Sequence, residues 1–314
     1  MKTITVVIPT YNEEENIPLV YERVVSIFTN QLTEYQYDIQ FIDNCSTDKS
    51  RQIILDLAKK DVHVRAIFNA KNFGFTRSTF YGLTQAEGDC AVLLFADMQD
   101  PPEIIPEFVA KWEQGYKIVT GIKTSSKESP IMYFIRKCYY GLIKRISEID
   151  HIEQFDGFGL YDSSFIQIIK QLDDPYPYLR GIIAELGYRR SEVAYVQQKR
   201  EHGKTSFNFL RLYDQAMLGI TSYSKIILRL ATMIGFAVAL VSLTIAAITL
   251  IYKLLNWDSF PVGLAAISIG VFFFGAVQLF FIGFLGEYVL NINTRILKRP
   301  LVIEERRINF PSEK

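Results

Sequence analysis

Short apolar runs alternate with longer amphipathic segments through the first part of the chain. The runs have the length and composition of buried strands and lie at residues 4–8, 37–42, 64–68, 90–95 and 117–121. The segments between them have helical spacing and predict helices that end near residues 28, 60, 86 and 114. Strict alternation of helices with wholly apolar strands is typical of a mostly parallel sheet with helices on both faces. We therefore predict an α/β domain in this part of the chain.

Polar residues support the predicted helix starts. Glu13, Glu14 and Glu15 are expected in the first turn of the first helix, where the helix dipole favours negative charge. Ser46 and Asp48 are expected to cap the second helix. These signals fix where each loop ends and the next helix begins.

Two long uncharged stretches follow in the C-terminal part. The first has 23 residues between Arg229 and Lys253, and the second has 28 residues between Asp258 and Glu287. Crossing a bilayer takes about 20 helical residues, so each stretch is long enough. Two core helices of a soluble protein are the alternative, but such helices normally carry a polar face. We predict two transmembrane helices joined by a short link.

The positive charges near these stretches predict their orientation. Lysine and arginine residues gather before the first stretch and after the second, whereas the link has only Lys253, offset by Asp258. The positive-inside rule then predicts a multi-pass protein of the cell inner (plasma) membrane, with the catalytic domain and both termini cytoplasmic. The three cysteines lack a CxxC spacing and are read as free thiols, which suits that compartment.

The whole chain divides into parts on this basis. Residues 1–205 are predicted to form the cytoplasmic domain, 206–228 a juxtamembrane amphipathic helix, 229–290 the two transmembrane helices and 291–314 a cytoplasmic tail. Residues 130–147 have helical apolar spacing with basic residues between, which indicates either an interface helix or a helix packed on its own domain. The chain has 34 basic and 34 acidic residues, so no positive field favours a nucleic acid partner.

Polar side chains follow the predicted strands at their carboxyl ends. They are Thr10 to Glu13, Asp43 and Asn44, Asn72, and Asp97 to Asp100. Ligands of open α/β sheets bind at this edge. No GxGxxG or GxxxxGK[ST] motif is present, which disfavours a dinucleotide oxidoreductase or a P-loop NTPase. Carboxylates here suit a metal bound to a diphosphate, with Asp97 best placed, although Asp43 alone is equally compatible with a turn.

A basic loop precedes the first uncharged stretch. Arg200, Lys204 and Ser206 lie around Gly203, a composition suited to close contact with a phosphate group. Contact with lipid headgroups is the alternative. The position of this loop near the predicted membrane is compatible with either.

These segments together resemble the family 2 glycosyltransferases. The motifs are Pro9-Thr10-Tyr11-Asn12-Glu13, Ile42 to Asp48, Asn72-Phe73-Gly74, Ala96 to Glu103 and Arg200 to Thr205. Their order, followed by the two uncharged stretches, resembles most the polyprenyl-phosphate glycosyltransferases, which include bactoprenol glucosyl transferases and dolichol-phosphate mannose synthases. The resemblance covers nearly the whole chain.

The resemblance implies a GT-A fold that binds a nucleotide sugar with Mg²⁺ or Mn²⁺. By position, substrate-binding residues are expected at Pro9, Tyr11, Glu13, Asp43, Asn72, Arg200, Lys204 and Ser206. Asp97 is expected to ligate the metal, helped by Gln99, because Phe95 stands where many relatives have a second aspartate. Asp97 and Asp156 are the expected catalytic residues.

Asp156 departs from the family pattern. Relatives often read Gly-Asp-Phe-Arg-Leu where this chain reads Asp156-Gly157-Phe158-Gly159-Leu160, so the carboxylate is displaced and the arginine is absent. A lipid phosphate has a second pKa near 6 and is about nine-tenths dianionic at pH 7, so it needs almost no general base. We therefore expect Asp156 to position the acceptor rather than to deprotonate it.

The resulting hypothesis is an inverting transfer of one sugar, glucose from UDP-glucose, to polyprenyl (undecaprenyl) phosphate at the cytoplasmic membrane face. The first alternative is a non-catalytic membrane scaffold that binds nucleotide or lipid in a glycan pathway. A processive polysaccharide synthase is disfavoured, because the chain has too few predicted spans and no QxxRW motif. The glycines of the second stretch are compatible with packing in a homo-oligomer or against the first stretch.

Overall fold

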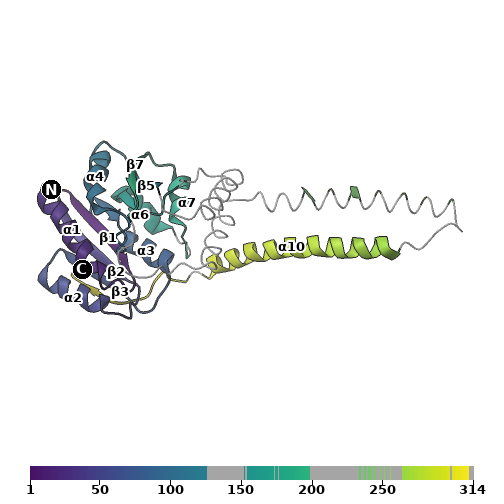
Figure 1. Cartoon of the computed structure of the whole chain (residues 1–314), viewed down its shortest axis with the longest axis horizontal. Coiled ribbons are helices and arrows are strands. Elements are labelled where there is room, and N and C mark those ends of the chain that lie inside the picture. Colours follow the sequence, from purple (N-terminus) through teal and green to yellow (C-terminus); the bar gives the residue numbers. More distant parts are fainter. Residues whose placement is uncertain are drawn as a thin grey trace.

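The structure is a computed structural model of the whole chain (Figure 1). It describes residues 1–125, 152, 154–172, 174–175, 177–198, 264–297 and 299–310, with isolated positions between 233 and 255. The predicted helices at 130–147 and 206–228 lie outside the described residues. So do Arg200, Lys204 and Ser206.

Eight strands of the described residues form one mixed sheet in the order β7-β5-β6-β4-β1-β2-β3-β8. They are β1 (Thr3–Thr10), β2 (Gln36–Asp43), β3 (Val64–Asn69), β4 (Cys90–Leu93), β5 (Ile118–Ser125), β6 (Gly159–Asp162), β7 (Arg190–Val196) and β8 (Glu304–Ile308). The pairs β1–β2, β1–β4, β2–β3 and β5–β7 are parallel, whereas β4–β6, β5–β6 and β3–β8 are antiparallel. The five predicted strands are confirmed, and the α/β prediction is confirmed with a sheet that is mixed.

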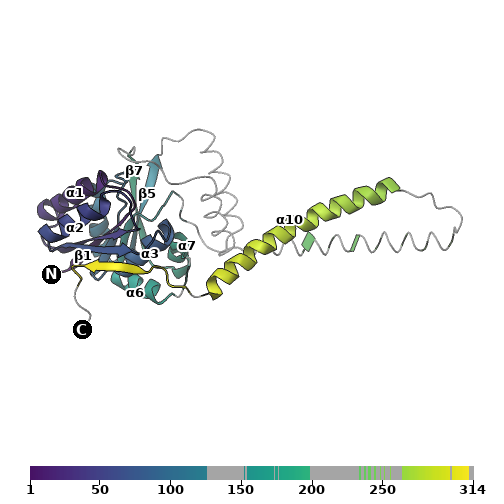
Figure 2. The same cartoon turned by 90° about the horizontal axis from the view of Figure 1, so that it is seen from below.

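Helices cover both faces of this sheet (Figures 1 and 2). They are α1 (Asn16–Asn30), α2 (Ser50–Lys60), α3 (Phe75–Thr84), α4 (Ile105–Glu113) after a short 3-10 helix (Pro102–Ile104), α6 (Ser163–Gln171) and α7 (Leu179–Leu186). Helices α1, α2 and α4 pack with Val6 and Ile8 on one face. Helices α3, α6 and α7 pack with Val7 and Leu93 on the other. The alternation of side chains along each strand therefore builds two separate core layers.

Two predicted helix starts are wrong in detail. Helix α1 begins at Asn16, so Glu13 to Glu15 precede it, and the Glu13 carbonyl accepts the Asn16 amide instead. Helix α2 begins at Ser50 and has no side-chain cap. Ser46 bonds the β1 loop, because its Oγ accepts the Asn12 N–H at 2.9 Å. Ser46 therefore satisfies a neighbouring loop, whereas Asp48 Oδ1 does accept the Ser50 N–H at 3.0 Å at the start of α2.

Asp162 joins two helices to the end of β6. Its carboxylate caps α6 by accepting the Ser164 N–H at 3.0 Å, and it also accepts Trp112 Nε1 at 2.7 Å and Lys117 Nζ at 3.0 Å. Burial alone would raise the pKa of Asp162, but the hydrogen bonds outweigh burial and hold that pKa below its usual value.

We expect Asp162→Ala to lower the free energy of unfolding at pH 7 by about 2–3 kcal/mol, through loss of the cap and of charged hydrogen bonds. Because the folded pKa is depressed, this stabilisation exists above the unfolded pKa of about 4 and is lost as pH falls through the folded pKa. Urea unfolding of both proteins between pH 3 and 7 measures the difference, which should shrink toward pH 3. A difference that stays constant with pH would contradict the role of the charge.

The chain returns to the sheet after a long helix. Helix α10 (Leu264–Ile296) has 33 residues, projects away from the α/β domain in both views, and exposes large apolar side chains such as Ile267 and Leu279 (Figures 1 and 2). Strand β8 then pairs antiparallel with β3 at the edge of the sheet. This strand replaces the tail predicted for residues 291–314, and no apolar pattern marks it, because four of its five residues are charged.

The prediction of a multi-pass membrane protein is contradicted. Among the residues that the structure describes, no helix meets the combined length and hydropathy of a membrane span. The second uncharged stretch is not a helix of its own, because α10 continues past Glu287 through Arg295. Of the first stretch, only isolated residues are described. The predicted hairpin and the localisation drawn from it are therefore withdrawn.

Candidate active site

One edge of the sheet collects the polar loops. Strands β1, β2, β3 and β4 are parallel, so their carboxyl ends meet there. Strand β6 runs antiparallel to both β4 and β5, so β5 and the parallel β7 also end at this edge, where β6 begins. The predicted site residues of the described chain lie at or next to these strand ends, with Asp156 just before β6, and their roles remain predictions.

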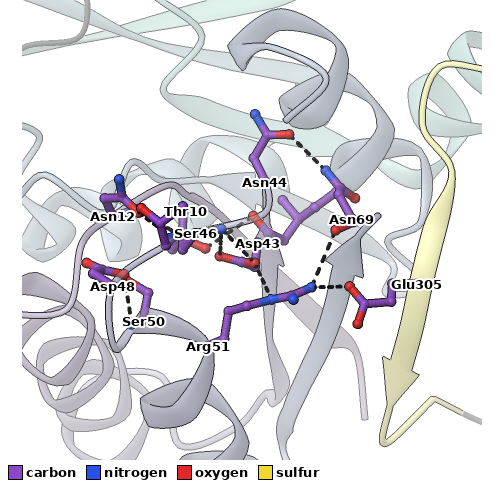
Figure 3. Close-up of polar contacts among 12 residues, drawn as sticks. Thr10, Asn12, Asp43, Asn44, Ser46, Asp48, Ser50, Arg51, Asn69 and Glu305 are labelled. Atoms are coloured by element: carbon purple, nitrogen blue, oxygen red, sulfur yellow. Dashed lines mark hydrogen bonds and ion pairs between the residues drawn. The ribbon is translucent and has the colours of Figure 1, made fainter. Parts of the chain in front are cut away.

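Asp43, at the end of β2, lies wholly buried beneath this edge. Its carboxylate accepts the Ser46 N–H at 3.2 Å and forms an ion pair with Arg51 Nε at 3.0 Å (Figure 3). Burial raises the pKa of the Asp43 carboxyl, and the hydrogen bonds of Ser46 and the charge of Arg51 oppose that rise. Asp43 therefore holds the turn that follows β2 and does not reach solvent.

The loop after β1 is fastened to that turn. Asn12 Oδ1 accepts the Thr47 N–H at 2.8 Å, and the Glu13 N–H donates to Ser50 Oγ at 2.9 Å. The Glu13 carboxylate is buried and accepts Asn16 Nδ2 at 2.6 Å, while Tyr11 beside it is 39% exposed. Of the predicted residues in this loop, Tyr11 thus offers a surface to a ligand, whereas Glu13 holds the loop. Pro9 lies within β1.

Asn72 belongs to a chain of side-chain amides. Asn44 Nδ2 donates to Asn72 Oδ1 at 3.0 Å, and Asn69 Nδ2 donates to Asn44 Oδ1 at 3.1 Å. Asn72 Oδ1 also accepts the Gly74 N–H at 2.9 Å. These contacts hold the loop after β3 against the loop after β2, so Asn72 stabilises the arrangement of these two loops at the predicted site.

Strained backbone marks the same edge. Four non-glycine residues have positive φ in loops at this edge: Asn12 (56°), Cys45 (63°), Met98 (58°) and Gln154 (56°). They lie after β1, β2 and β4 and before β6. Each such conformation costs on the order of 1 kcal/mol and persists only where surrounding contacts hold it, which is common at functional sites.

A second group of side chains follows β4. Asp97 Oδ1 accepts the Gln99 N–H at 3.3 Å, and Gln99 Oε1 accepts Gln197 Nε2 at 2.9 Å. Asp100 is 1% exposed and accepts the Tyr195 hydroxyl. The Asp97 loop is therefore joined to the residues that follow β7.

Asp156 lies beside this group and is paired. Lys123 Nζ contacts Asp156 Oδ2 at 2.5 Å, and the two side chains are 13% and 25% exposed. Gly157, with φ 119°, follows it and lets the chain turn into β6. Asp156 thus carries its own counter-ion from β5, which the sequence motif did not reveal.

The charges of this group act on one another. Burial, and then the negative charges of Asp156 and Asp97, raise the pKa of Asp100 to about 8, against the opposing effect of Lys123. Burial and the same carboxylates also raise the pKa of Tyr195. The edge therefore holds several negative groups with Lys123 as their nearby cation, an arrangement suited to a positively charged ligand or intermediate.

Comparison with known proteins adds the family. Residues 5–170 match the model of Glycosyl transferase family 2. A prophage-derived bactoprenol glucosyl transferase of Shigella flexneri is 33% identical over 96% of both chains. An uncharacterised glycosyltransferase of Synechocystis is 31% identical over 96% of this chain and 94% of its own.

The chain belongs to glycosyl transferase family 2. The resemblance stated from the motifs is confirmed, and the protein is a glycosyltransferase. The alternative of a non-catalytic scaffold is set aside.

Solved structures are similar to this glycosyltransferase at low identity. Glucosyl-3-phosphoglycerate synthase of Mycobacterium tuberculosis, in complex with Mn²⁺, UDP and phosphoglyceric acid, is 14% identical over 70% of this chain and 76% of its own, with a TM-score of 0.48. TarS of Staphylococcus aureus in complex with UDP-GlcNAc is 17% identical over 71% of this chain and 66% of its own, with a TM-score of 0.47.

The donor set of the glycosyltransferase fits a metal shared with a substrate. No three histidine, cysteine or acid side chains converge to ligate a metal within the part of the chain that the structure describes. A divalent cation that bridges a diphosphate needs only one or two protein carboxylates, and Asp97 is a carboxylate at this edge. Phe95 packs against Phe75, with ring centroids 5.4 Å apart, so its position supplies an apolar wall. The Gln99 amide is partly committed to Gln197.

Some residues of the site were missed by the sequence analysis. They are Arg51, Lys123, Tyr195 and Glu305, which pair with Asp43, Asp156, Asp100 and Arg51 respectively. Each lies far along the chain from its partner or within a regular element, where no local motif marks it. Arg51 lies in α2, shortly after Asp43, whereas the fold brings the other pairs together from distant parts of the chain.

Proposed function

We propose that this glycosyltransferase moves one glucose from UDP-glucose to polyprenyl phosphate, such as undecaprenyl phosphate, with inversion at the anomeric carbon. The observation that carries the proposal is the meeting of Asp97, Asp156 and Lys123 at one sheet edge. The chain that contains them is 33% identical to a bactoprenol glucosyl transferase over nearly its full length. Carboxylates at such an edge suit a divalent cation, which would offset the negative charge of two phosphate-bearing substrates.

The nucleotide half of the site is proposed at the loops after β1, β2 and β3, within a GT-A arrangement. Tyr11 offers an exposed ring for a base, and Asp43 holds the turn beneath it. Asp97, with Gln99 beside it, would hold Mg²⁺ or Mn²⁺ on the donor diphosphate, where the cation would offset the charge of the departing UDP. The family roles of Pro9, Glu13 and Asn72 remain predictions.

The acceptor needs positioning more than deprotonation. A phosphate oxygen forms the bond to the anomeric carbon, while the bond from that carbon to UDP breaks and UDP keeps the electron pair. Because the phosphate is mainly dianionic at pH 7, no proton has to move. Asp156, oriented by Lys123, is proposed to fix the approach of the acceptor. Arg200, Lys204 and Ser206 remain predicted phosphate contacts.

Transfer into lipid tests this proposal. The full chain is incubated with undecaprenyl phosphate in detergent, Mn²⁺ and each of UDP-glucose, UDP-galactose, UDP-N-acetylglucosamine and GDP-mannose, all radiolabelled in the sugar. We expect label in the organic phase with UDP-glucose, one sugar per lipid, equimolar UDP release and a β-linkage by NMR. A retained α-linkage would contradict inversion, and products with several sugars would favour a polysaccharide synthase. No labelled lipid with any donor would reject the acceptor.

A further inference from the structure

Strand β8 reaches the active-site edge through a bulge. It pairs antiparallel with β3, so β8 begins near the carboxyl end of β3. Phe68 pairs with Arg306 and Asn69 pairs with Glu304, which leaves Glu305 as the extra residue between them. A bulge of this kind re-aims a side chain. Glu305 is therefore directed differently from a regular strand residue.

The neighbours of Glu305 reach the opposite face of the sheet. The Glu304 carboxylate accepts a hydrogen bond from the Tyr81 hydroxyl at 2.8 Å, and Arg307 donates to Gln85 Oε1 at 2.5 Å. Tyr81 belongs to α3, and Gln85 follows that helix directly. Glu305 instead accepts Arg51 on α2, which packs against the other face. Adjacent residues of a strand face opposite sides in any case, so Glu304 and Glu305 diverge; the bulge adds that Glu304 and Arg307 meet on the same face.

Arg51 joins three strands by one guanidinium group. Arg51 Nε forms an ion pair with Asp43, at the end of β2, at 3.0 Å (Figure 3). Arg51 Nη2 forms an ion pair with Glu305 of β8 at 2.7 Å and also donates to the Asn69 carbonyl of β3 at 3.4 Å. Figure 3 shows the Arg51 side chain between the Asp43 and Glu305 carboxylates. The planar fork of arginine suits such simultaneous contacts, which a lysine could not reproduce.

Asp43 depends on these contacts for its orientation. It is fully buried, so water does not hold it, and its side-chain contacts are the Ser46 turn and Arg51. A buried carboxylate that loses its cation is strongly disfavoured as a charge. Any shift of Arg51 is therefore transmitted to the turn after β2 and, through Ser46, to Asn12 of the β1 loop.

We propose that the C-terminal strand β8 is part of the nucleotide-binding site, with Arg51 as a positioning residue for Asp43 and Glu305 as the residue that orients Arg51. The inference rests on the proposed function, in which the loops after β1 and β2 receive the nucleotide. Its consequence is that a segment more than 250 residues distant from Asp43 tunes donor affinity. The acceptor half, around Asp156, is not part of this connection.

Two adjacent isosteric variants separate this effect from simple strand docking. Glu305→Gln removes the charge that faces Arg51, and Glu304→Gln removes the neighbouring charge that faces Tyr81 and Arg307. We expect Glu305→Gln to raise the dissociation constant of UDP and the KM for UDP-glucose about two- to fivefold, the size of an exposed ion pair. The kcat at saturating donor and the acceptor KM should stay unchanged. Glu304→Gln should leave UDP binding unchanged.

The arginine variants extend the test. Arg51→Lys keeps the charge but loses the fork, and we expect a rise in the UDP dissociation constant larger than that of Glu305→Gln. In the Arg51→Lys background, Glu305→Gln should add less than it does alone, because the two residues act through one contact. Calorimetric titration of the full chain with UDP and Mn²⁺ measures each constant without requiring transfer.

The outcomes separate this inference from the proposed reaction. Equal weakening of UDP binding by Glu304→Gln and Glu305→Gln would reject this inference. So would an effect of Glu305→Gln on kcat alone, or additive effects when Arg51→Lys and Glu305→Gln are combined. Retained UDP binding with no transfer to undecaprenyl phosphate would reject the proposed acceptor and leave this inference standing. Absence of UDP binding by the unchanged chain would reject both the donor and this inference.

Discussion

Asp97→Asn is expected to lower kcat/KM for sugar transfer by about 10³-fold, the size of effect seen when one group that stabilises developing charge is removed. Asparagine keeps the shape of the side chain and its contact with the Gln99 amide, but it removes the negative charge. The cation that would offset the charge of the departing UDP then loses the carboxylate that would hold it at the carboxyl end of β4. Initial rates with labelled UDP-glucose and undecaprenyl phosphate give the effect.

A control and a binding measurement make this prediction specific. Glu103→Gln removes a nearby acid that is 51% exposed and lies 3.6 Å from Arg23, so we expect activity within about twofold of the unchanged chain. UDP affinity is measured with and without Mn²⁺ for all three proteins. We expect Mn²⁺ to strengthen UDP binding except in Asp97→Asn. If Asp97→Asn keeps that strengthening, Asp97 does not hold the metal.

The sequence predicted which edge of the sheet carries the site better than it predicted the strands and contacts that complete the site. Apolar runs located five strands, and the rule that ligands bind at carboxyl ends placed Asp43 and Asp97 together at one edge. Those signals are local, since each depends on a run of a few residues. Strand β6 depends on antiparallel pairing with β4 and β5, and β7 on parallel pairing with β5, and no local pattern encodes either.

The basic partners of the site carboxylates could not be predicted from the sequence, for a physical reason. Lys123 and Arg51 are ordinary basic residues of a strand and a helix, and their importance comes from the carboxylates they meet across the sheet edge. Strand β8 has a charged sequence because it lies at the sheet edge, where charges discourage further pairing. The same charged composition suits both an edge strand and an exposed tail, so the sequence alone does not distinguish them.

Lys123→Met is expected to impair transfer more than Asp156→Asn does. Removing the lysine leaves the Asp156 charge without its cation, next to Asp97 and the buried Asp100. Removing one partner of a partly buried ion pair leaves the other charge without compensation, which is less favourable than replacing both partners. We expect about a 10²–10³-fold loss in kcat/KM for Lys123→Met, which leaves the Asp156 charge, and about tenfold for Asp156→Asn, which removes it. The double variant should be more active than Lys123→Met alone. Steady-state rates of the four proteins form the cycle.

The pH profile then decides what Asp156 does. If Asp156 positions the acceptor, Asp156→Asn should lower the rate by the same factor between pH 6.5 and 8, because the phosphate is mainly dianionic over that range without help from the enzyme. If Asp156 removed a proton, the rise of rate with pH should change shape in Asp156→Asn and the loss should grow at the acidic end, where more of the acceptor is protonated. A loss of all transfer at every pH, with both substrates still bound, would also reject a role limited to positioning. The Lys123 contact favours the first outcome, since an ammonium group 2.5 Å from Asp156 Oδ2 holds that carboxylate in one orientation.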